Sequence, residues 1–402
     1  MSSSSNSGGS RGRARGKRSH ARLRVWMTVN MAVLVTFTGW VYWAANSRGD
    51  ASHAAAKSAA AAAIPGATYS AAPAASAASA TAKAAATASA SASKTASATP
   101  TTPTVAQIEA EPGKYFGITA NNVPGDPAAF TTVANSATVA PNAVEYYVNW
   151  TQSFSSADVF DSYSEGALPV ITWEPFAGGT TGHTILDQPD YALSTIIDGD
   201  HDSYITQFAE AVKAVKVPVA IRFMHEMNGN WYPWSVNEQG NTSTQFVEAW
   251  RHVWDIFHSV GATNVIWIWA PNVLRGAQDD VSLASVYPGD QYVDWIGMSA
   301  YEDYETTAEQ LLGPTLDDIR GFTQKNVLIT ETGGQPNANK APWIANFLAW
   351  LPQQPNVIGF IWNEYTTSVD ARAAWGFDAD SASLAAFRAG IKKIQLAAIP
   401  TP

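Results

Sequence analysis

Eight short apolar runs alternate with longer amphipathic stretches from Glu111 onward, and this alternation constrains the fold more than any other feature. Short runs rich in β-branched residues are typical of buried strands, and apolar residues spaced three and four apart are typical of helices. Eight such units over roughly 290 residues predict an α/β fold, the (β/α)8 TIM barrel. A doubly wound open sheet is the alternative, but no GxGxxG or phosphate loop follows the first run. The expected strands are Tyr115–Ile118, Val144–Val148, Leu168–Trp173, Val217–Met224, Val265–Trp269, Trp295–Met298, Val327–Thr330 and Ile358–Trp362.

Helical periodicity is readable between most of these runs. The stretch Thr244–Val260 places five large apolar side chains on one face. Thr242 with Gln245 predicts a capping box before this helix, and Gly261 predicts its end. Further helices are expected at Ser203–Val215, Ala308–Phe322, Pro342–Leu351 and Ser381–Leu396.

The first 110 residues have a different character. Residues 1–24 form a basic tail, and residues 25–45 are mostly apolar and about long enough to cross a bilayer. We therefore expect a transmembrane signal-anchor, with a cytoplasmic N-terminus and the rest of the chain exported; a cleaved signal peptide is the alternative. Residues 46–110, nearly all Ala, Ser, Thr and Pro over most of their length, are expected to be a disordered linker. The barrel domain is expected to span residues 111–398.

Composition and charge restrict the chemistry and the partners. The chain has no Cys, which excludes disulfides, thiolate metal sites and cysteine nucleophiles. Residues 1–105 carry eleven Lys or Arg and one acid, so the remainder has a net charge of −20. Such a domain is a poor partner for nucleic acid, whereas a neutral polysaccharide would not be repelled. Sixteen Trp and fourteen Tyr are more than packing alone easily explains, and sugar-binding clefts use such rings as platforms.

Polar and aromatic residues follow the expected strands, at the end of a barrel where active sites lie. Glu226 follows the fourth strand and Glu331 the seventh, so a closed barrel can bring the two carboxylates face to face. Two opposed carboxylates are what glycoside hydrolysis requires. The alternation of side chains along the fourth strand puts Arg222, Met224 and Glu226 on one side, so Arg222 is expected beneath the site, as a positive charge or as a buried ion pair. The remaining strand ends read Asn121-Asn122, Asn149-Trp150, Trp173-Glu174, Trp269 to Asn272, Tyr301-Glu302 and Trp362 to Glu364.

The sequence RFMHEMNGNWYPW, residues 222–234, resembles the acid/base signature of glycoside hydrolase family 26, a family of retaining (β/α)8 barrels. The resemblance implies that Glu226 is the general acid/base and Glu331 the nucleophile. It also implies that His225 contacts the substrate or the catalytic carboxylate, and that Trp231 lines the sugar site. Tyr301 would hydrogen-bond the nucleophile, and Trp362 would be the platform under the reacting sugar. The local match covers His225, Glu226, Asn228, Gly229, Trp231 and Trp234.

The resemblance further implies double displacement through a covalent glycosyl-enzyme, with the two carboxyls about 5 to 5.5 Å apart. No metal or other cofactor is required, and a zinc HExxH motif is excluded because Gly229 stands where its second His would be. The expected substrate is a β-1,4-linked mannan-type polysaccharide, cleaved by an endo-acting monomer. Mixed-linkage β-1,3-1,4-glucan or another β-glycan stays open, because Trp173-Glu174-Pro175 stands where mannan-cleaving members commonly place a His.

Four tryptophans that fall at or just after strand ends are expected to line the cleft. A non-catalytic carbohydrate-binding surface protein is the alternative from another class, and a structural surface protein with the barrel as a spacer is a third. The pair of opposed carboxylates disfavours the binding protein, because binding alone needs no such pair. The four residues are Trp173, Trp231, Trp234 and Trp362.

Overall fold

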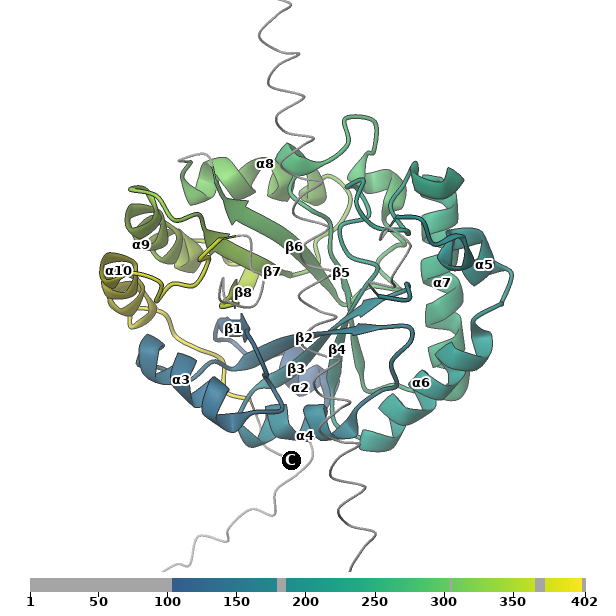
Figure 1. Ribbon diagram of the computed structural model, residues 1–402, viewed down its shortest axis with the longest axis horizontal. Coiled ribbons are helices and arrows are strands. Elements are labelled where there is room, and N and C mark those ends of the chain that lie inside the picture. Colours follow the sequence, from purple (N-terminus) through teal and green to yellow (C-terminus); the bar gives the residue numbers. More distant parts are fainter. Residues whose placement is uncertain (1–102, 179–185, 304–305, 366–372, 400–402) are drawn as a thin grey trace, which may run out of the picture. The chain divides into compact units, whose positions relative to one another are not determined.

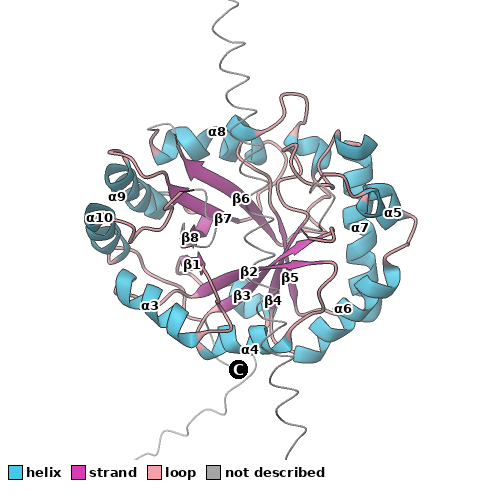
Figure 2. Cartoon of the chain, viewed as in Figure 1, coloured by secondary structure: helices cyan, strands magenta, loops and turns pink. Residues whose placement is uncertain are grey.

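The computed structural model describes residues 103–178, 186–303, 306–365 and 373–399. Eight parallel strands close into a barrel in which each strand pairs with its neighbours along the chain and β8 pairs with β1. Figures 1 and 2 show the ring of strands at the centre, with the helices around it. The predicted TIM barrel is therefore confirmed. The strands are β1 Tyr115–Thr119, β2 Ala143–Asn149, β3 Leu168–Glu174, β4 Val219–Phe223, β5 Val265–Trp269, β6 Trp295–Glu302, β7 Val327–Gly334 and β8 Val357–Asn363.

Helices follow most strands and cover the outside of the barrel (Figure 1). The helix expected to run to Leu396 ends at Ile391, and the segment after it pairs Leu396 with Lys114 beside β1. The α-helices are α2 Val105–Glu109, α3 Pro127–Ala137, α4 Ser156–Ser164, α5 Leu193–Ile197, α6 Asp202–Val215, α7 Ser243–Val260, α8 Ala308–Arg320, α9 Lys340–Trp350 and α10 Ser381–Ile391. Short 3₁₀ segments lie at Pro189–Tyr191, Glu238–Gly240, Leu274–Gly276, Leu283–Val286 and Leu351–Gln353.

Helix α7 shows how local sequence sets these boundaries. The Gln245 amide N–H donates to Oγ1 of Thr242 at 3.2 Å, and the Thr242 amide N–H donates to Oε1 of Gln245 at 3.0 Å. These two bonds form the predicted capping box and satisfy amides that have no partner within the helix. Gly261 ends the helix in a left-handed conformation, with φ of 79°, that glycine adopts without strain.

The short helix α2 lies inside the range expected to be linker. Its Ile108 is fully buried, and the Tyr115 hydroxyl donates to the Ile108 carbonyl at 2.8 Å. The boundary expected at residue 111 is therefore too late, because packing against the barrel already includes α2. The basic tail, the apolar segment 25–45 and the linker up to residue 102 lie outside the described residues. Within the described ranges, no helix is both long and apolar enough to cross a membrane.

Two apolar cores lie on opposite sides of the strands. One fills the lower part of the barrel interior with side chains such as Leu168, Val170 and Ile268, and the other lies between the strands and the helices. Successive side chains of a strand therefore point alternately to the interior and to the helices. Towards the C-terminal ends of the strands the interior side chains become polar, and this change marks the candidate site.

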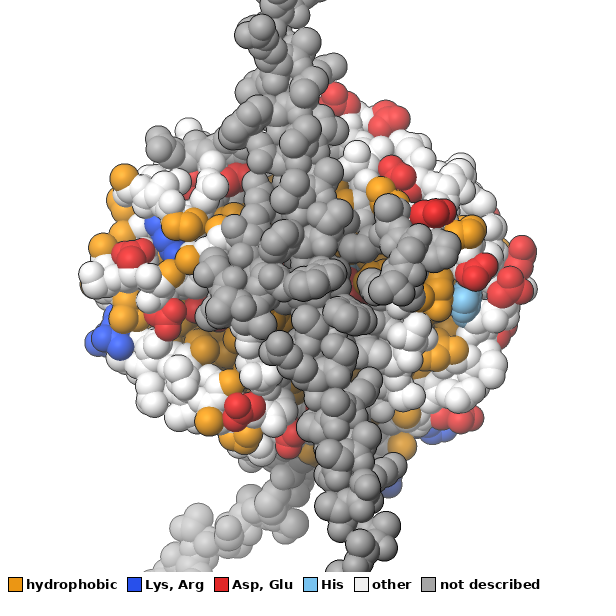
Figure 3. Space-filling view, in the orientation of Figure 1, with side chains coloured by type: hydrophobic (Ala, Val, Ile, Leu, Met, Phe, Trp, Pro, Cys, Tyr) orange, Lys and Arg blue, Asp and Glu red, His pale blue; other side chains and the backbone are white. Residues whose placement is uncertain are grey.

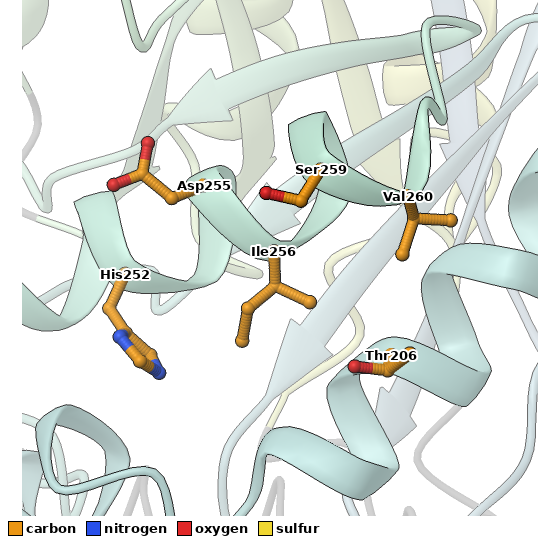
Figure 4. Close-up of a pocket in the computed structure, with 6 residues that line it drawn as sticks. All are labelled: Thr206, His252, Asp255, Ile256, Ser259 and Val260. Carbon is orange, nitrogen blue, oxygen red and sulfur yellow. The ribbon is translucent and has the colours of Figure 1, made fainter.

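The surface carries two further features. Acidic side chains are spread over the visible face with few Lys or Arg, in keeping with the negative charge of the barrel domain (Figure 3). A depression on the helical layer is lined by residues that all come from α6 and α7 (Figure 4). They are Thr206, His252, Asp255, Ile256, Ser259 and Val260.

Candidate active site

A polar cluster centred on Arg222 of β4 lies in the barrel interior above the apolar layers. The guanidinium group is fully buried, and its Nη1 lies 2.5 Å from Oε1 of Glu331 and 3.2 Å from Oε1 of Glu145. Nη2 donates to Oγ of Ser299 at 2.6 Å, and Oγ1 of Thr172 donates to Glu145 at 2.5 Å. Arg222 therefore lies beneath the site as predicted, and it is at once a positive charge for Glu331 and part of a buried ion pair.

Glu331 reaches this cluster because β7 is irregular. Leu328 belongs to the interior core and Ile329 to the outer one, so strict alternation would turn Glu331 towards the helices. The register of β7 against β8 shifts between Ile329 and Thr332, and the pairing of β6 with β7 shifts beside it. Such shifts re-aim side chains in strands. The Glu331 carboxylate consequently faces Arg222, and its Oε2 accepts a hydrogen bond from the Tyr301 hydroxyl at 2.9 Å.

Glu226 is placed by an unusual turn just after β4. Met224 and Glu226 both adopt left-handed conformations, with φ of 44° and 54°. The Glu226 amide still donates to the carbonyl of Ala270 at 2.7 Å, so the segment stays attached to β5 while its direction changes. Met224 packs in the outer core, so the expected alternation of Arg222, Met224 and Glu226 does not hold at Met224.

Three side chains hold the Glu226 carboxyl. Trp231 Nε1 donates to Oε2 at 2.6 Å, and Asn272 Nδ2 donates to Oε1 at 3.3 Å. Ser299 also hydrogen-bonds this carboxyl, which links Glu226 to Arg222 through one hydroxyl. The Trp231 indole can lie over the loop because position 229 is glycine: a Cβ there would come within 2.3 Å of the ring.

Glu226 and Glu331 differ in the charges that lie next to their carboxyl groups. Burial and the neighbouring negative charge of Glu331 raise the pKa of Glu226 to about 7, although Arg222 and the Trp231 bond oppose this. Burial also works against the charge on Arg222, but Glu331 and Glu145 outweigh burial and raise the Arg222 pKa. Glu331 is therefore paired directly with a permanent cation, while Glu226 is the carboxyl that holds a proton near neutral pH.

Two further buried acids belong to this cluster. Burial raises the pKa of Glu145 to about 8, with Arg222 opposing the change, and Oε2 of Glu145 has no hydrogen-bond partner in the described part of the chain. Burial likewise holds the pKa of Glu174, at the end of β3, well above its usual value, and the charges of Glu331 and Glu226 add to the effect. Glu174 is thus a buried acid near both candidate catalytic carboxyls and not a solvated surface acid.

The loop after β4 contains three predicted site residues that the structure places in supporting positions. His225 is fully buried, its Nε2 is 2.9 Å from the Tyr232 hydroxyl, and burial holds its pKa well below the usual value. Trp234 is also fully buried, stacks on Tyr232 at 4.3 Å and donates to the His225 carbonyl. Buried Asn228 exchanges two hydrogen bonds with the backbone of Asn272. These three residues shape the loop that carries Trp231, and the expected contact of His225 and Trp234 with substrate stays a prediction.

Trp173 and Trp362 do not line the cleft, contrary to the prediction. Trp173 is fully buried and stacks on Phe208 of α6 at 4.5 Å. Trp362 is fully buried against the helical side of β8, with Trp343 of α9 at 5.8 Å. Each ring follows an interior residue of its strand by one position and therefore points to the helices.

Trp375, which is not among the predicted site residues, packs its ring against Tyr301, whose hydroxyl bonds Glu331. Its ring centroid lies 4.9 Å from that of Tyr301, whose hydroxyl also accepts a bond from Asn363 Nδ2 at 2.9 Å. Asn363 was noted only as a polar strand end. Trp375 stands in the connection between β8 and α10, where no periodic pattern indicates its direction, so the sequence offered no signal for it.

Comparison with known proteins gives a consistent result. Residues 133–328 match the model of glycosyl hydrolase family 26, a range that includes Glu226 and stops before Glu331. Endoglucanase H of Acetivibrio thermocellus is 28% identical over 261 residues, which cover 62% of this chain and 27% of that protein. A mannan endo-1,4-beta-mannosidase of Bacillus subtilis (strain 168) is 26% identical over 198 residues, which cover 45% of this chain and 50% of that protein. The chain thus matches half or less of the length of these curated relatives.

Solved structures show the same fold. A GH26 beta-mannanase from Bacteroides ovatus superposes with a TM-score of 0.55 at 16% identity, covering 73% of this chain and 92% of that one. A modular endo-beta-1,4-mannanase from Cellulomonas fimi superposes with a TM-score of 0.54 at 18% identity, covering 72% and 76%. In sequence over residues 133–328, and in its (β/α)8 fold, this chain resembles glycosyl hydrolase family 26.

Proposed function

We propose that this chain is a retaining endo-β-glycanase that cleaves a β-1,4-linked mannan-type polysaccharide. The observation that carries the proposal is the unequal surroundings of two carboxyls in one buried polar cluster. Glu331 is ion-paired with Arg222 at 2.5 Å, whereas burial raises the pKa of Glu226 to about 7. An acid with a raised pKa beside a carboxylate that is ion-paired to an arginine is the arrangement that glycoside hydrolysis uses.

The reaction begins with Glu331 attacking the anomeric carbon while Glu226 gives its proton to the departing glycosidic oxygen. A covalent glycosyl-enzyme forms and the leaving sugar gains the proton. Glu226, now ionised, takes a proton from water, which attacks the same carbon and releases Glu331. Arg222 and the Tyr301 hydroxyl each hold one oxygen of Glu331, so the attacking carboxylate is oriented before substrate arrives.

Mannan is the first substrate to test, because the family resemblance includes mannan endo-1,4-beta-mannosidases. A mixed-linkage or β-1,4-linked glucan is the second candidate, and two observations favour it. The relative Endoglucanase H is 28% identical over the longest alignment given above. The segment Trp173-Glu174-Pro175 also stands at the end of β3, near which the family resemblance implies a His in mannan-cleaving members.

The test is incubation of the purified full-length protein with mannan, mixed-linkage β-glucan and xylan, scoring new reducing ends and product lengths. We expect release from mannan or the mixed-linkage glucan, with oligosaccharides of several lengths appearing early. The Glu226→Gln/Glu331→Gln double variant is the control for contaminating activity. If the wild-type protein binds these glycans and cleaves none, the carbohydrate-binding alternative replaces the enzyme.

We further propose that the barrel acts outside the cytoplasm, anchored to the membrane through residues 25–45. Seven Lys or Arg between Arg11 and Arg24 precede this apolar segment, which favours a cytoplasmic N-terminus. Fractionation of the native host would place the protein with the membrane and leave the barrel open to added protease. Recovery of a shortened chain in the medium would support signal cleavage instead.

Size-exclusion chromatography with light scattering of the detergent-solubilised protein tests the expected monomer.

A further inference from the structure

Lys340, the first residue of α9, is a buried cation that contacts a loop of the candidate active site. Only 1% of the residue is exposed. Its Nζ donates to the carbonyl oxygens of Ala374 and Gly376, both at 2.6 Å. These two residues stand on either side of Trp375, so one ammonium group holds the backbone before and after the indole.

A second side chain holds the same segment. Trp362 Nε1 donates to the carbonyl of Trp375 at 3.1 Å, so three consecutive carbonyls are bonded by side chains from β8 and α9. The Phe377 amide, next along the chain, donates to Oε1 of Glu364 at 2.8 Å. The segment 374–377 is therefore fixed by hydrogen bonds along its whole length.

The two glycines that end β7 make room for this arrangement. A Cβ at Gly333 would come within 3.1 Å of Cβ of Trp375 and 3.4 Å of the Tyr301 ring, which sit against each other there. A Cβ at Gly334 would come within 3.1 Å of Cγ of Lys340. This glycine pair, separated from Glu331 only by Thr332, thus lets both the ring and the lysine stem approach the strand.

Burial lowers the pKa of Lys340, and the nearby charges of Asp380, Glu364 and Asp378 oppose that change. The ammonium group is thus surrounded by acids and carbonyls, which replace the water that it loses on burial. Because Lys carries three donors on one nitrogen, a single residue can bond both carbonyls at once.

We propose that Lys340 is a positioning residue of the active site, which fixes the Trp375 indole against Tyr301, the residue whose hydroxyl bonds Glu331. It acts from outside the cleft, through the backbone on either side of Trp375. The expected effect of Lys340 on catalysis rests on the proposed function. Its expected effect on the position of the Trp375 indole does not depend on that function. Loss of the ammonium group should let the indole move, and a displaced aromatic ring should bind the sugar more weakly.

The structural arm uses full-length protein labelled with 5-fluorotryptophan. The ¹⁹F resonance that disappears in Trp375→Phe is assigned to Trp375. Lys340→Met should shift or broaden this resonance. Lys114→Met is the matched control, because Lys114 also bonds two carbonyls, those of Gln354 and Val357, but beside β1 at the other end of the barrel. It should lower stability and leave the resonance unchanged. If Lys340→Met does not fold, Trp362→Phe removes the other hold on the segment and should move the same resonance.

The kinetic arm is a double-mutant cycle on the best glycan substrate. Lys340→Met should lower kcat/KM about tenfold, mainly through KM, and Lys114→Met should not. In the Trp375→Ala background the Lys340 substitution should have almost no further effect, because the residue on which it acts is gone. Independent, additive losses together with an unmoved Trp375 resonance would overturn the proposal. Absence of turnover in the wild type would refute the proposed function, while the ¹⁹F arm would still decide whether Lys340 positions Trp375.

Discussion

Trp231 donates its indole N–H to Oε2 of Glu226 across 2.6 Å. This bond favours the ionised carboxylate and so lowers the pKa of Glu226, while burial and the charge of Glu331 raise it to about 7. One tryptophan therefore both covers the acid and limits how strongly it holds its proton. The balance between the two effects predicts the pH dependence of the proposed hydrolysis.

We expect kcat/KM to fall as the pH rises through about 7, because the proton on Glu226 is needed for the first step. Trp231→Phe removes a bond to the ionised form, so the pKa of Glu226 should rise and the alkaline limb should move to higher pH. The measurement is a pH profile of kcat/KM with a soluble oligosaccharide. Trp254→Phe, on α7, is the matched control and should leave the limb in place; a limb that moves to lower pH in Trp231→Phe would contradict the assignment.

The two carboxylates can be assigned by chemical rescue. Glu331→Ala should abolish hydrolysis, and azide should restore reaction of an aryl glycoside with an inverted glycosyl azide as product, because azide attacks from the vacated side. Glu226→Ala should lower kcat for a natural glycan about 10²- to 10⁴-fold. Azide should then give a product of retained configuration, because it attacks the covalent intermediate. NMR of the products reads the configuration, and the same configuration from both variants would contradict the assignment.

Stability should depend on pH because of the buried acids. The pKa of Glu145 is raised to about 8 in the folded protein, against about 4.3 for an unfolded glutamate. A raised folded-state pKa means that the contribution to stability is complete below the unfolded pKa and is lost as the pH rises through about 8. The urea concentration at the midpoint of unfolding should therefore decrease as the pH is raised from 5 to 8. Glu145→Gln should make this decrease with pH smaller. A slope unchanged in Glu145→Gln would mean that Glu145 is ionised in the folded state.

Substitution of Trp173 should mainly lower stability, whereas substitution of Trp375 should mainly weaken substrate binding. Trp173→Ala leaves a cavity beneath α6 and should cost about 3–5 kcal/mol in the free energy of unfolding, with KM unchanged in the folded protein. Trp375→Ala should raise KM with a smaller loss of stability. Urea denaturation and steady-state kinetics of both variants are sufficient. A raised KM in Trp173→Ala would restore the original cleft interpretation.

The pattern of apolar runs predicted all eight strands and their closure, because strand and helix periods are local properties of the sequence. It also indicated Glu226, which stands after β4, whereas Glu331, expected to follow the seventh strand, lies inside β7. The same alternation, applied to β3 and β8, could have turned Trp173 and Trp362 towards the helices, since Leu168 and Ile361 face the interior.

Other features had no local signal. The register shift that turns Glu331 inward depends on how three strands pair, and the left-handed residues at Met224 and Glu226 are neither glycine nor asparagine. The Trp375 segment is ordered by Lys340 from a different helix. These features arise from tertiary contacts between distant segments, so the local sequence of one segment does not predict them.

The left-handed turn that carries Glu226 has a consequence for how such a chain changes over generations. Non-glycine residues in this conformation cost about 1–3 kcal/mol each, and burying an acid without full pairing adds to the cost. Glycine at position 226 would remove both the conformational cost and the cost of burying the acid. The resulting barrel would be more stable and inactive. Selection of random variants for heat resistance alone should therefore discard the acid early, and selection for sugar release should bring it back.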